Sequence, residues 1–468
     1  MPLSGNPTFA LQPNAERVAL ATNYINNFDF LNQYLPDTYE KEFERYGNRS
    51  ISSFLRMVGA EMPSNSDLIT WAEQGRLHTK YVDVGTAAAA GDDVAIFQVN
   101  DVITGGGERA IRVGQTLLIS QNDGSGVNKG VVTLAAAGAA TFTVAFYEGA
   151  GLVTAGTGVG NADVTIMIYG SEFGKGTNGM EGSIEAEDSI FNNKPIIIKD
   201  TYAVNGSDMA QIGWVEVTTE NGASGYLWYM KSEHETRLRF DDYLETAMIE
   251  AVPAEAASGA IALAQPLTGS DGVFFVVENR GNVWTGGNPT TLADFDAVIQ
   301  RLDRQGAIEE NVLFVNRDFS FDIDDMLAAQ NSYGAGGTSY GLFDNDEEMA
   351  LNLGFTGFRR GYDFYKSDWK YLNDPTMRGD LASGAVNGLL VPAGSTNVYD
   401  QVLGKNAKRP FLHVRYRASE TEDRRYKTWI TGSAGGASSS SLDAMEVNYL
   451  SERAVCTLGA NNFVIFQA

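Results

Sequence analysis

The sequence predicts an α+β protein with an inserted small all-β domain. Three observations predict this class: short β-type runs fill residues 82–170, one amphipathic helix follows near 232–252, and the rest of the chain alternates strand-like and helix-like segments. The chain has 468 residues, of which 43% are hydrophobic and 20% charged. That length suits roughly two to four domains, each with its own core.

Residues 1–60 predict a thin N-terminal arm. Amphipathic spacing favours a helix over residues 14–30 and shorter helices near Tyr39–Tyr46 and Ile51–Val58, separated by Pro and Gly. Such a segment buries little by itself. We therefore expect the arm to lie against a later domain or a neighbouring subunit, and residues 61–81 to link it to the next part of the chain.

Residues 82–170 predict a small barrel or sandwich, because short apolar runs are separated there by clusters of Gly, Ala, Asn and Asp. The expected strands are Val94–Val99, Thr116–Ser120, Gly130–Leu134, Thr141–Phe146 and Val164–Ile168.

Residues 171–230 predict a protruding β-hairpin. Its arms would be Pro195–Lys199 and Ile212–Val217, on either side of Asn205-Gly206. Asn-Gly favours a tight hairpin turn because both residues tolerate positive φ.

The clearest helix is expected from Ser232 to Val252. Ser232 and Glu235 have the spacing of a capping box, and Pro253 would end the helix. Its apolar face would consist of Phe240, Leu244, Ala247, Met248 and Ala251.

The remaining chain predicts a mixed α/β half that closes in β-structure. A helix is expected from Thr291 and Asp294 to just before Gly306. A second helix is expected at Phe321–Ala329, and a flexible loop at Gly432–Ser441. The expected strands are Gly272–Val277, Asn311–Asn316, Phe355–Phe358, Leu389–Val391, Phe411–Arg417, Lys427–Thr431, Asp443–Leu450 and Phe463–Phe466.

No stretch gathers the residues that catalysis, a cofactor or a metal site requires. His234-Glu235 begins like the zinc motif HExxH, but Leu238 occupies the second histidine position. A nucleophile elbow and a phosphate-binding Gly-Lys loop are both missing. Acidic clusters at 322–325 and 344–348 lack the EF-hand spacing. The first cluster is interpreted as lying at the N-terminus of a helix, where negative charge suits the helix dipole. We therefore expect no catalytic, cofactor-binding or metal-binding residues.

Charge and cysteine content narrow the function further. The net charge is −25, which argues against general, non-specific binding of nucleic acid. Basic clusters at 359–360, 415–417 and 424–427 are interpreted as partners for acidic residues of another surface, as in head-to-tail association. The single cysteine, Cys456, allows no intrachain disulfide, and we expect it to be a buried apolar residue. We expect no signal peptide and no membrane span.

This order of segments resembles the HK97-fold major capsid proteins of tailed bacteriophages. The 354–371 tract and the 82–170 insertion are most similar to capsid proteins of crAss-like phages. The resemblance implies these parts: an N-terminal arm (1–60), a link (61–81), an inserted all-β domain (82–170), an E-loop region (171–230), a peripheral domain with a spine helix (231–272), an axial domain (273–404) and a return to the peripheral domain (405–468). Within the E-loop region, the extended loop maps to about 191–220.

The resemblance implies contacts between subunits through the extended loop. The candidate contact residues are Lys194, Lys199, Asn205, Gly206 and Trp214. Some family members crosslink Lys to Asn covalently, but no Lys/Asn/Glu set can be matched to positions of this sequence. No crosslink is therefore carried over.

The implied function is self-assembly into pentamers and hexamers that form an icosahedral head around the DNA genome. The implied partners are copies of the chain, a portal, a separate scaffolding protein and auxiliary or decoration proteins. DNA would be enclosed without specific binding, and no membrane would be involved. The location would be the virion, after assembly in the host bacterial cytoplasm. The alternatives are another virion component, such as a tail-tube or decoration protein, or a β-rich carbohydrate-active protein.

Overall fold

The computed structural model describes residues 60–467 with several gaps. The residues outside the description within that range are 77, 79, 90–93, 100–110, 123–125, 136–140, 149–163, 183–187, 210–216, 219–223, 226–227, 307, 332–355, 380, 382, 401–404, 435 and 437–438. The three predicted helices of the N-terminal arm therefore lie outside the described residues. The chain divides into two compact units, one made of Thr70–Asn192 and the other of the residues before and after it.

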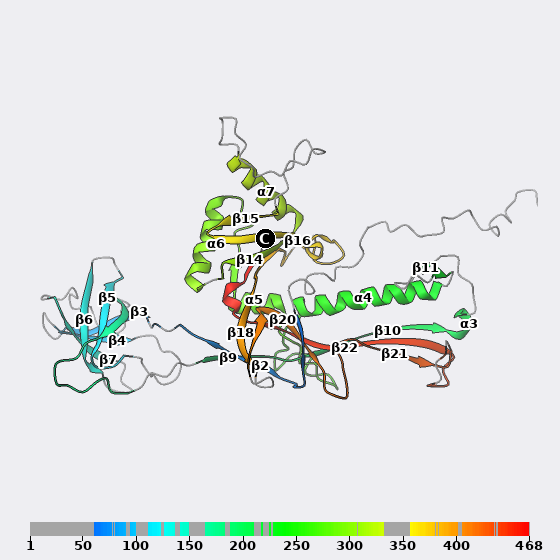
Figure 1. Ribbon diagram of the computed structural model, residues 1–468, viewed down its shortest axis with the longest axis horizontal. Coiled ribbons are helices and arrows are strands. Elements are labelled where there is room, and N and C mark those ends of the chain that lie inside the picture. Colours follow the sequence, from blue (N-terminus) through cyan, green and yellow to red (C-terminus); the bar gives the residue numbers. More distant parts are fainter. Residues whose placement is uncertain are drawn as a thin grey trace, which may run out of the picture. The chain divides into compact units, whose positions relative to one another are not determined.

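The unit Thr70–Asn192 contains a closed antiparallel barrel, drawn mainly in cyan in Figure 1. Its strands are β3 (Lys80–Ala89), β4 (Val94–Val99), β5 (Gln115–Gln121), β6 (Val127–Ala135), β7 (Thr141–Phe146) and β8 (Val164–Ser171), in the order β3-β4-β7-β6-β5-β8. Val84, Leu117, Val144 and Ile166 fill the interior and are fully buried. The five strands expected from the sequence are confirmed, and β3 is an additional strand.

Two further strands flank the barrel in sequence. Strand β2 (Ile69–Gln74) and strand β9 (Asp188–Asn193) pair as a two-stranded ribbon, so the barrel residues are inserted between the two strands of the ribbon. Trp71 and Phe191 lie across this ribbon with ring centroids 6.4 Å apart.

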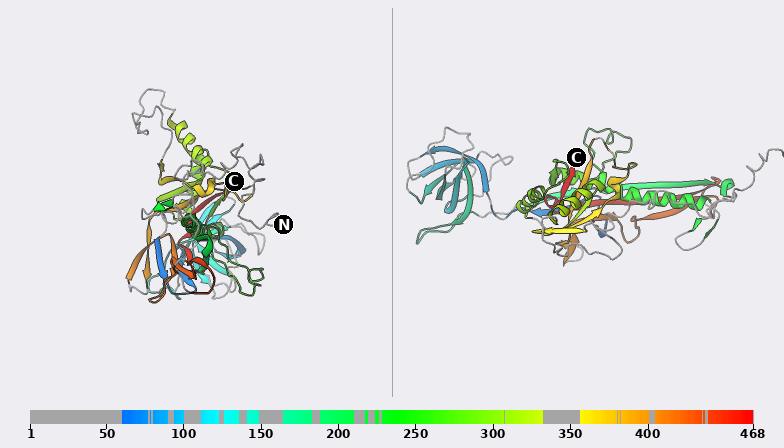
Figure 2. Two further views of the ribbon diagram at one scale, coloured as in Figure 1. Left: turned by 90° about the vertical axis from the view of Figure 1, so that its right-hand side faces the viewer. Right: turned by 90° about the horizontal axis from the view of Figure 1, so that it is seen from above.

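In the other unit, one sheet carries the longest described helix. The sheet has the order β1-β20-β22-β10, and β21 also pairs with β22. The strands are β1 (Ala60–Ser64), β10 (Ile196–Asn205), β20 (Leu412–Arg417), β21 (Lys427–Gly432) and β22 (Ala444–Thr457). Helix α4 (Trp228–Glu250) packs against β10 and β22, and the view from above in Figure 2 shows it running beside them.

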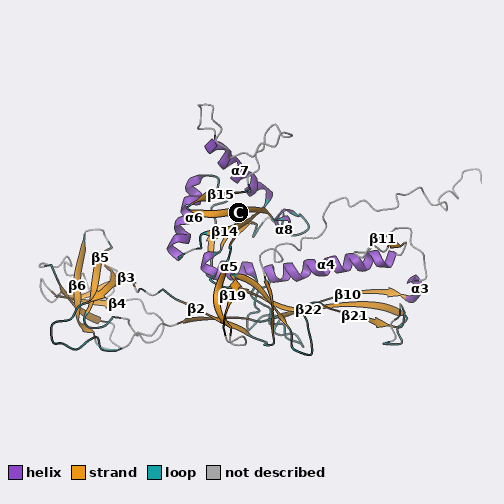
Figure 3. Cartoon of the chain, in the orientation of Figure 1, coloured by secondary structure: helices purple, strands orange, loops and turns teal. Residues whose placement is uncertain are grey.

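A second, six-stranded sheet has the order β13-β23-β17-β14-β16-β15. Its strands are β13 (Asn282–Trp284), β14 (Glu310–Val315), β15 (Gly357–Arg360), β16 (Tyr362–Asp368), β17 (Val386–Pro392) and β23 (Val464–Gln467). The associated helices are α5 (Val273–Arg280), α6 (Leu292–Gln305), α7 (Arg317–Asn331) and α8 (Lys370–Asn373). The described helices, purple in Figure 3, all belong to the unit outside Thr70–Asn192. The α+β class with an inserted all-β domain is therefore confirmed.

Short elements complete the description. They are α3 (Gly206–Met209), β11 (Val217–Thr218), β12 (Ser224–Gly225), β18 (Ser395–Asp400), β19 (Lys405–Pro410) and the 3₁₀ turn Ala460–Asn462.

Two apolar cores hold the six-stranded sheet. On one face, α6 and α7 contribute Phe295, Val298 and Phe319, which pack against strand residues such as Phe466. The other core combines α5 and the end of α4 with residues of both sheets, including Val414 of β20. This shared core joins the two sheets into one compact unit.

The helix predicted to start at Thr291 is confirmed as α6, and the structure shows a capping box at its start. The Thr291 side chain accepts from the backbone N–H of Asp294, and the Asp294 carboxylate accepts from the N–H of Thr291. At the other end, Gly306 adopts φ 78°, the left-handed conformation that ends helices.

Two predicted helix and strand assignments are wrong. Gly272–Val277 was expected as a strand, but Val273 begins helix α5. A short apolar run does not distinguish a buried strand from a buried helix. Ser232 is not the N-cap of α4, because the helix begins at Trp228 and the Thr236 hydroxyl donates to the Ser232 carbonyl at 2.9 Å inside it.

The predicted tight turn at Asn205-Gly206 is also wrong, and residues 212–216 of the predicted second arm lie outside the described residues. Strand β10 pairs antiparallel with β22 over its whole length, from Ile196 opposite Arg453 to Asn205 opposite Ala444. Gly206 starts the short helix α3 instead of a tight turn. A local turn signal was overridden here by a strand more than 200 residues away in sequence, which only tertiary structure can select.

Candidate functional site

The most distinctive surface is a layer that we call the paddle, made of α4, β10, β21 and β22. Its interior is a single apolar seam in which Phe240 and Leu244 of α4 meet Val204 of β10 and Val447 of β22. The Phe240 ring lies 5.6 Å from the Tyr449 ring and 5.3 Å from the Tyr426 ring, centroid to centroid. The predicted apolar face of the helix is therefore confirmed at Phe240, Leu244 and Met248, which are buried.

The face of the paddle opposite α4 is polar and hydrogen-bonded across three strands. The Thr201 hydroxyl donates to Asn448 Oδ1 at 3.1 Å, and Asn448 Nδ2 donates to Thr431 Oγ1 at 3.1 Å. The Thr431 hydroxyl donates to Glu446 Oε2 at 3.0 Å. Polar side chains of this kind are compatible with exposure to water. Trp429 of β21 is 36% exposed on this face and adds a large apolar group.

The five predicted contact residues do not converge on one place. Lys194, Lys199 and Asn205 are exposed along β10 and the residues before it, and Trp214 lies outside the described residues. At about 3.3 Å per residue, Lys194 and Asn205 are roughly 35 Å apart. Gly206 follows Asn205, and its N–H donates to the Asp443 carbonyl at 3.2 Å. Their role in subunit contacts stays a prediction.

Asn193, at the start of the paddle, is a structural residue that the sequence did not reveal. Its side chain is 3% exposed. Its Nδ2 donates to the carbonyls of Asp271 at 2.9 Å and Val455 at 2.7 Å. Its Oδ1 accepts from the Ser270 hydroxyl at 2.9 Å and from the Asp271 N–H at 2.9 Å. The chain enters β10 just after Asn193. The side chain of Asn193 therefore ties this point both to β22 and to the segment before α5.

Members of the three basic clusters pair with carboxylates of the same chain, and their expected role as partners for another surface stays a prediction. Arg424 Nε lies 2.8 Å from Glu452, and Arg453 lies 3.3 Å from Glu61 of β1. Arg425 also pairs with Glu61. In the second sheet, Arg359 pairs with Asp363 at 3.0 Å and Arg360 pairs with Asp296. These ion pairs could not be predicted from the basic clusters in the sequence, because most of the carboxylates come from strands and helices that are distant in sequence.

The acidic residues at 322–325 lie inside α7 and not at its N-terminus, because the helix begins at Arg317. Asp324 pairs with Lys366 at 2.5 Å, and Asp322 accepts from Asn288 Nδ2 at 2.7 Å. Among the described residues, no group of three or more His, Cys, Asp or Glu side chains could hold a metal ion. The second acidic cluster, 344–348, lies outside the described residues.

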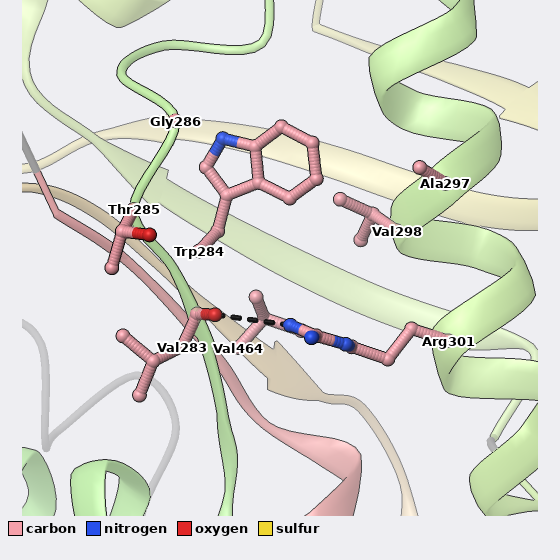
Figure 4. A pocket seen from close by; sticks show the side chains of 8 residues that line it. All are labelled: Val283, Trp284, Thr285, Gly286, Ala297, Val298, Arg301 and Val464. Atoms are coloured by element: carbon pink, nitrogen blue, oxygen red, sulfur yellow. Dashed lines mark hydrogen bonds between the residues drawn. The ribbon is translucent and has the colours of Figure 1, made fainter.

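A hollow of about 370 Å³ lies at the edge of the six-stranded sheet, between β13 and α6. Figure 4 shows the Trp284 indole and the Val298 side chain facing one another across it, with the Arg301 side chain at one end. Arg301 Nη1 donates to the Val283 carbonyl at 3.0 Å, and Trp284 Nε1 donates to the Gly287 carbonyl at 2.9 Å. The hollow thus combines an apolar wall with a cation.

No helix in the described part of the chain combines the length and the apolar character that a membrane crossing requires.

No family model and no curated protein sequence matches the chain. Similar solved structures come from phages and from a GTA particle. A chain from Microbacterium phage Oxtober96 has 9% identity and a TM-score of 0.41, with 95% of this chain and 99% of that chain covered. The capsid of a native GTA particle has 8% identity and a TM-score of 0.38, with 93% and 95% covered. A chain from Mycobacterium phage Adephagia has 7% identity and a TM-score of 0.36, with 93% and 96% covered. The narrower likeness to crAss-like phages stays a prediction.

Proposed function

We propose that this chain is a major capsid protein of the HK97-like class. Its copies assemble into pentamers and hexamers that close an icosahedral phage head around double-stranded DNA. The observation that carries the proposal is the paddle, in which a long helix lies along a long strand pair and continues into a mixed α/β sheet. That arrangement is the layout that the order of segments in the sequence implies for a spine helix and an axial domain.

The paddle also has the physical properties of a surface that forms contacts between copies of the chain. It is one helix thick, so α4 shields only one face of β10 and β22. The other face exposes Trp429 and polar groups that are already satisfied. Contact with a neighbouring copy can bury such a face without leaving a buried donor or acceptor unpaired.

The ribbon β2–β9 is the element that we assign as the extended loop. It precedes β10 and α4 in sequence, as the extended loop must, whereas residues 196–205 belong to the paddle sheet. In this assignment the barrel is an insertion at the tip of the extended loop. A closed barrel exposes no free strand edges, so it can be carried on a loop without aggregating through them.

The role we propose is structural rather than enzymatic. Its further partners are a portal, a separate scaffolding protein and auxiliary or decoration proteins, and its location is the virion after assembly in the host cytoplasm. The net charge of −25 supports the proposal that the shell encloses DNA without binding it generally.

Negative-stain electron microscopy with light scattering tests the proposal, on the chain expressed alone and with its neighbouring genes. We expect closed shells or rings of five and six. Tubes would favour a tail-tube protein, and a monomer under every condition would refute the capsid function.

A shortened variant tests the ribbon. Residues 75–187 are replaced by a short Gly-Ser turn, which keeps β2 and β9. A second variant removes the ribbon as well. We expect shells from the first variant and open or irregular assemblies from the second. Normal shells from both would contradict the assignment of β2–β9.

A further inference from the structure

The hollow beside β13 lies at an edge of the six-stranded sheet where no described strand continues the pairing. Strand β13 stands at one end of the sheet order, with β23 on one side only. Its Trp284 ring is held in place by the hydrogen bond to the Gly287 carbonyl. The ring, Val298 of α6 and Val464 of β23 form an apolar wall that is already shaped before anything binds (Figure 4).

Arg301 gives the hollow a positive end. Its side chain is exposed, and its Nη1 donates to the Val283 carbonyl, so the other guanidinium N–H groups can bind a further acceptor. Within the described part of the chain it forms no ion pair with a carboxylate, whereas Arg359 and Arg360 of the same sheet do. In a chain with 59 acidic and 34 basic residues, an arginine without a carboxylate is a natural anchor for an acidic surface.

Helix α7 carries a complementary knob, which we define as Phe321 with Asp318 and Asp325. Phe321 is 56% exposed, although its neighbours Phe319 and Ile323 are buried in the core. Positions 318, 321 and 325 are spaced by three and four residues, so they share one face of the helix. Both aspartates are exposed. The Arg317 guanidinium also lies 5.9 Å from the Phe321 ring centroid, and it pairs with Asp368, so the net charge of the knob comes from Asp318 and Asp325. An exposed aromatic ring with two carboxylates beside it matches an apolar hollow with an arginine at its end.

We propose that Phe321 of one copy enters the hollow of a second copy, where Asp325 or Asp318 pairs with Arg301. This inference rests on the proposed self-assembly and names the surfaces that meet. Knob and hollow are different surfaces of one chain, so the contact is head-to-tail and can close into a ring. Aromatic and arginine side chains are the residues that most often dominate such contacts.

Charge exchange tests the pairing. Arg301→Glu and Asp325→Arg are each expected to reduce the yield of rings or shells at least tenfold at a fixed protein concentration. The double variant is expected to recover most of the yield, because the pair is restored with opposite polarity. Phe321→Ala is expected to raise the concentration required for assembly by about 10–100-fold. Leu263→Ala, at an apolar residue that is 52% exposed and belongs to neither surface nor to the paddle, serves as the matched control and should assemble normally.

Crosslinking tests the geometry. Ala297→Cys and Phe321→Cys subunits, each in a Cys456→Ala background, are mixed and oxidised. Disulfide-linked pairs containing one subunit of each kind are expected, and either variant alone should give far fewer. Circular dichroism on each variant checks that it remains folded.

The possible failures are distinguishable. If wild-type shells form but the charge exchange gives no recovery and the mixed disulfide is missing, the knob-and-hollow contact is wrong while the capsid function stands. If the wild-type chain forms no assembly under any condition, both fail together.

Discussion

Replacing Asn193 by leucine removes a hydrogen-bonding centre while keeping the number and branching of the side-chain heavy atoms. The substitution leaves the Ser270 hydroxyl, the Asp271 N–H and the Asp271 and Val455 carbonyls without their present partner. Each buried polar group left unpaired costs about 1–3 kcal/mol. Asp271 is only partly buried, so water can replace some of its bonds. Ser270 and the Val455 carbonyl lie deeper. We therefore expect a loss of about 3–5 kcal/mol in the free energy of unfolding.

The assay is urea denaturation of disassembled subunits, followed by tryptophan fluorescence and far-ultraviolet circular dichroism. The transition of the unit that contains Asn193 should move to lower urea. The transition of the barrel unit should not, because none of the hydrogen-bond partners of Asn193 given above belongs to Thr70–Asn192. Ser270→Ala is the matched control and removes one of these bonds, so it should cost about 1 kcal/mol.

A loss below about 1 kcal/mol for Asn193→Leu, or one equal to that of Ser270→Ala, would refute the reasoning. Either result would mean that water or a local shift satisfies the abandoned groups. In the assembled state, the same variant should loosen the start of β10, because Asn193 ties that point to β22.

Gly432→Ala should destabilise the paddle by about 2 kcal/mol or more in urea denaturation, because Gly432 has φ 118° and an added Cβ would lie 1.9 Å from the Ala444 carbonyl oxygen. Gly436→Ala, with φ 86° and open space, should cost about 1 kcal/mol, and equal losses would contradict the steric argument. Burial lowers the pKa of His413 from 6.5 to about 4, so the unfolded chain takes up the proton first as the pH falls. Stability should therefore fall by about 3 kcal/mol between pH 6.5 and pH 4, and His413→Gln should flatten that part of the profile. Burial raises the pKa of the Cys456 thiol to about 12, so a thiol reagent at pH 8 should modify it only after unfolding, and rapid labelling of the native chain would contradict its 2% exposure.

Local patterns in the sequence were sufficient where a single element decides its own structure. The capping box at Thr291 and the left-handed Gly306 bracket α6 because both signals act within one helical turn of its ends. The barrel strands were predictable because each short apolar run is bounded by turn residues. The buried face of α4 followed from its period, although its first turn did not.

Predictions failed where a partner distant in sequence competes with a local signal. Asn205-Gly206 is a strong hairpin signal, yet β10 pairs with β22, because that pairing places Val204 in the seam beneath α4. The apolar run at Val273 became a helix because it packs into a core shared by two sheets. For the candidate surfaces, the sequence suggested the exposed residues Lys194 and Lys199 but did not indicate which residues form a hollow or a knob.

By itself, the sequence determined the class of the protein, the positions of most strands and helices, the absence of an intrachain disulfide and a strongly acidic balance. These properties depend on composition and on spacing within about a dozen residues. Only the tertiary structure decided the partners: β10 with β22, Glu61 with Arg453, and Asn193 with Val455. Such pairs form because burying the two partners together lowers the free energy of the folded chain. That free energy depends on a whole layer of side chains, so neither residue by itself identifies its partner.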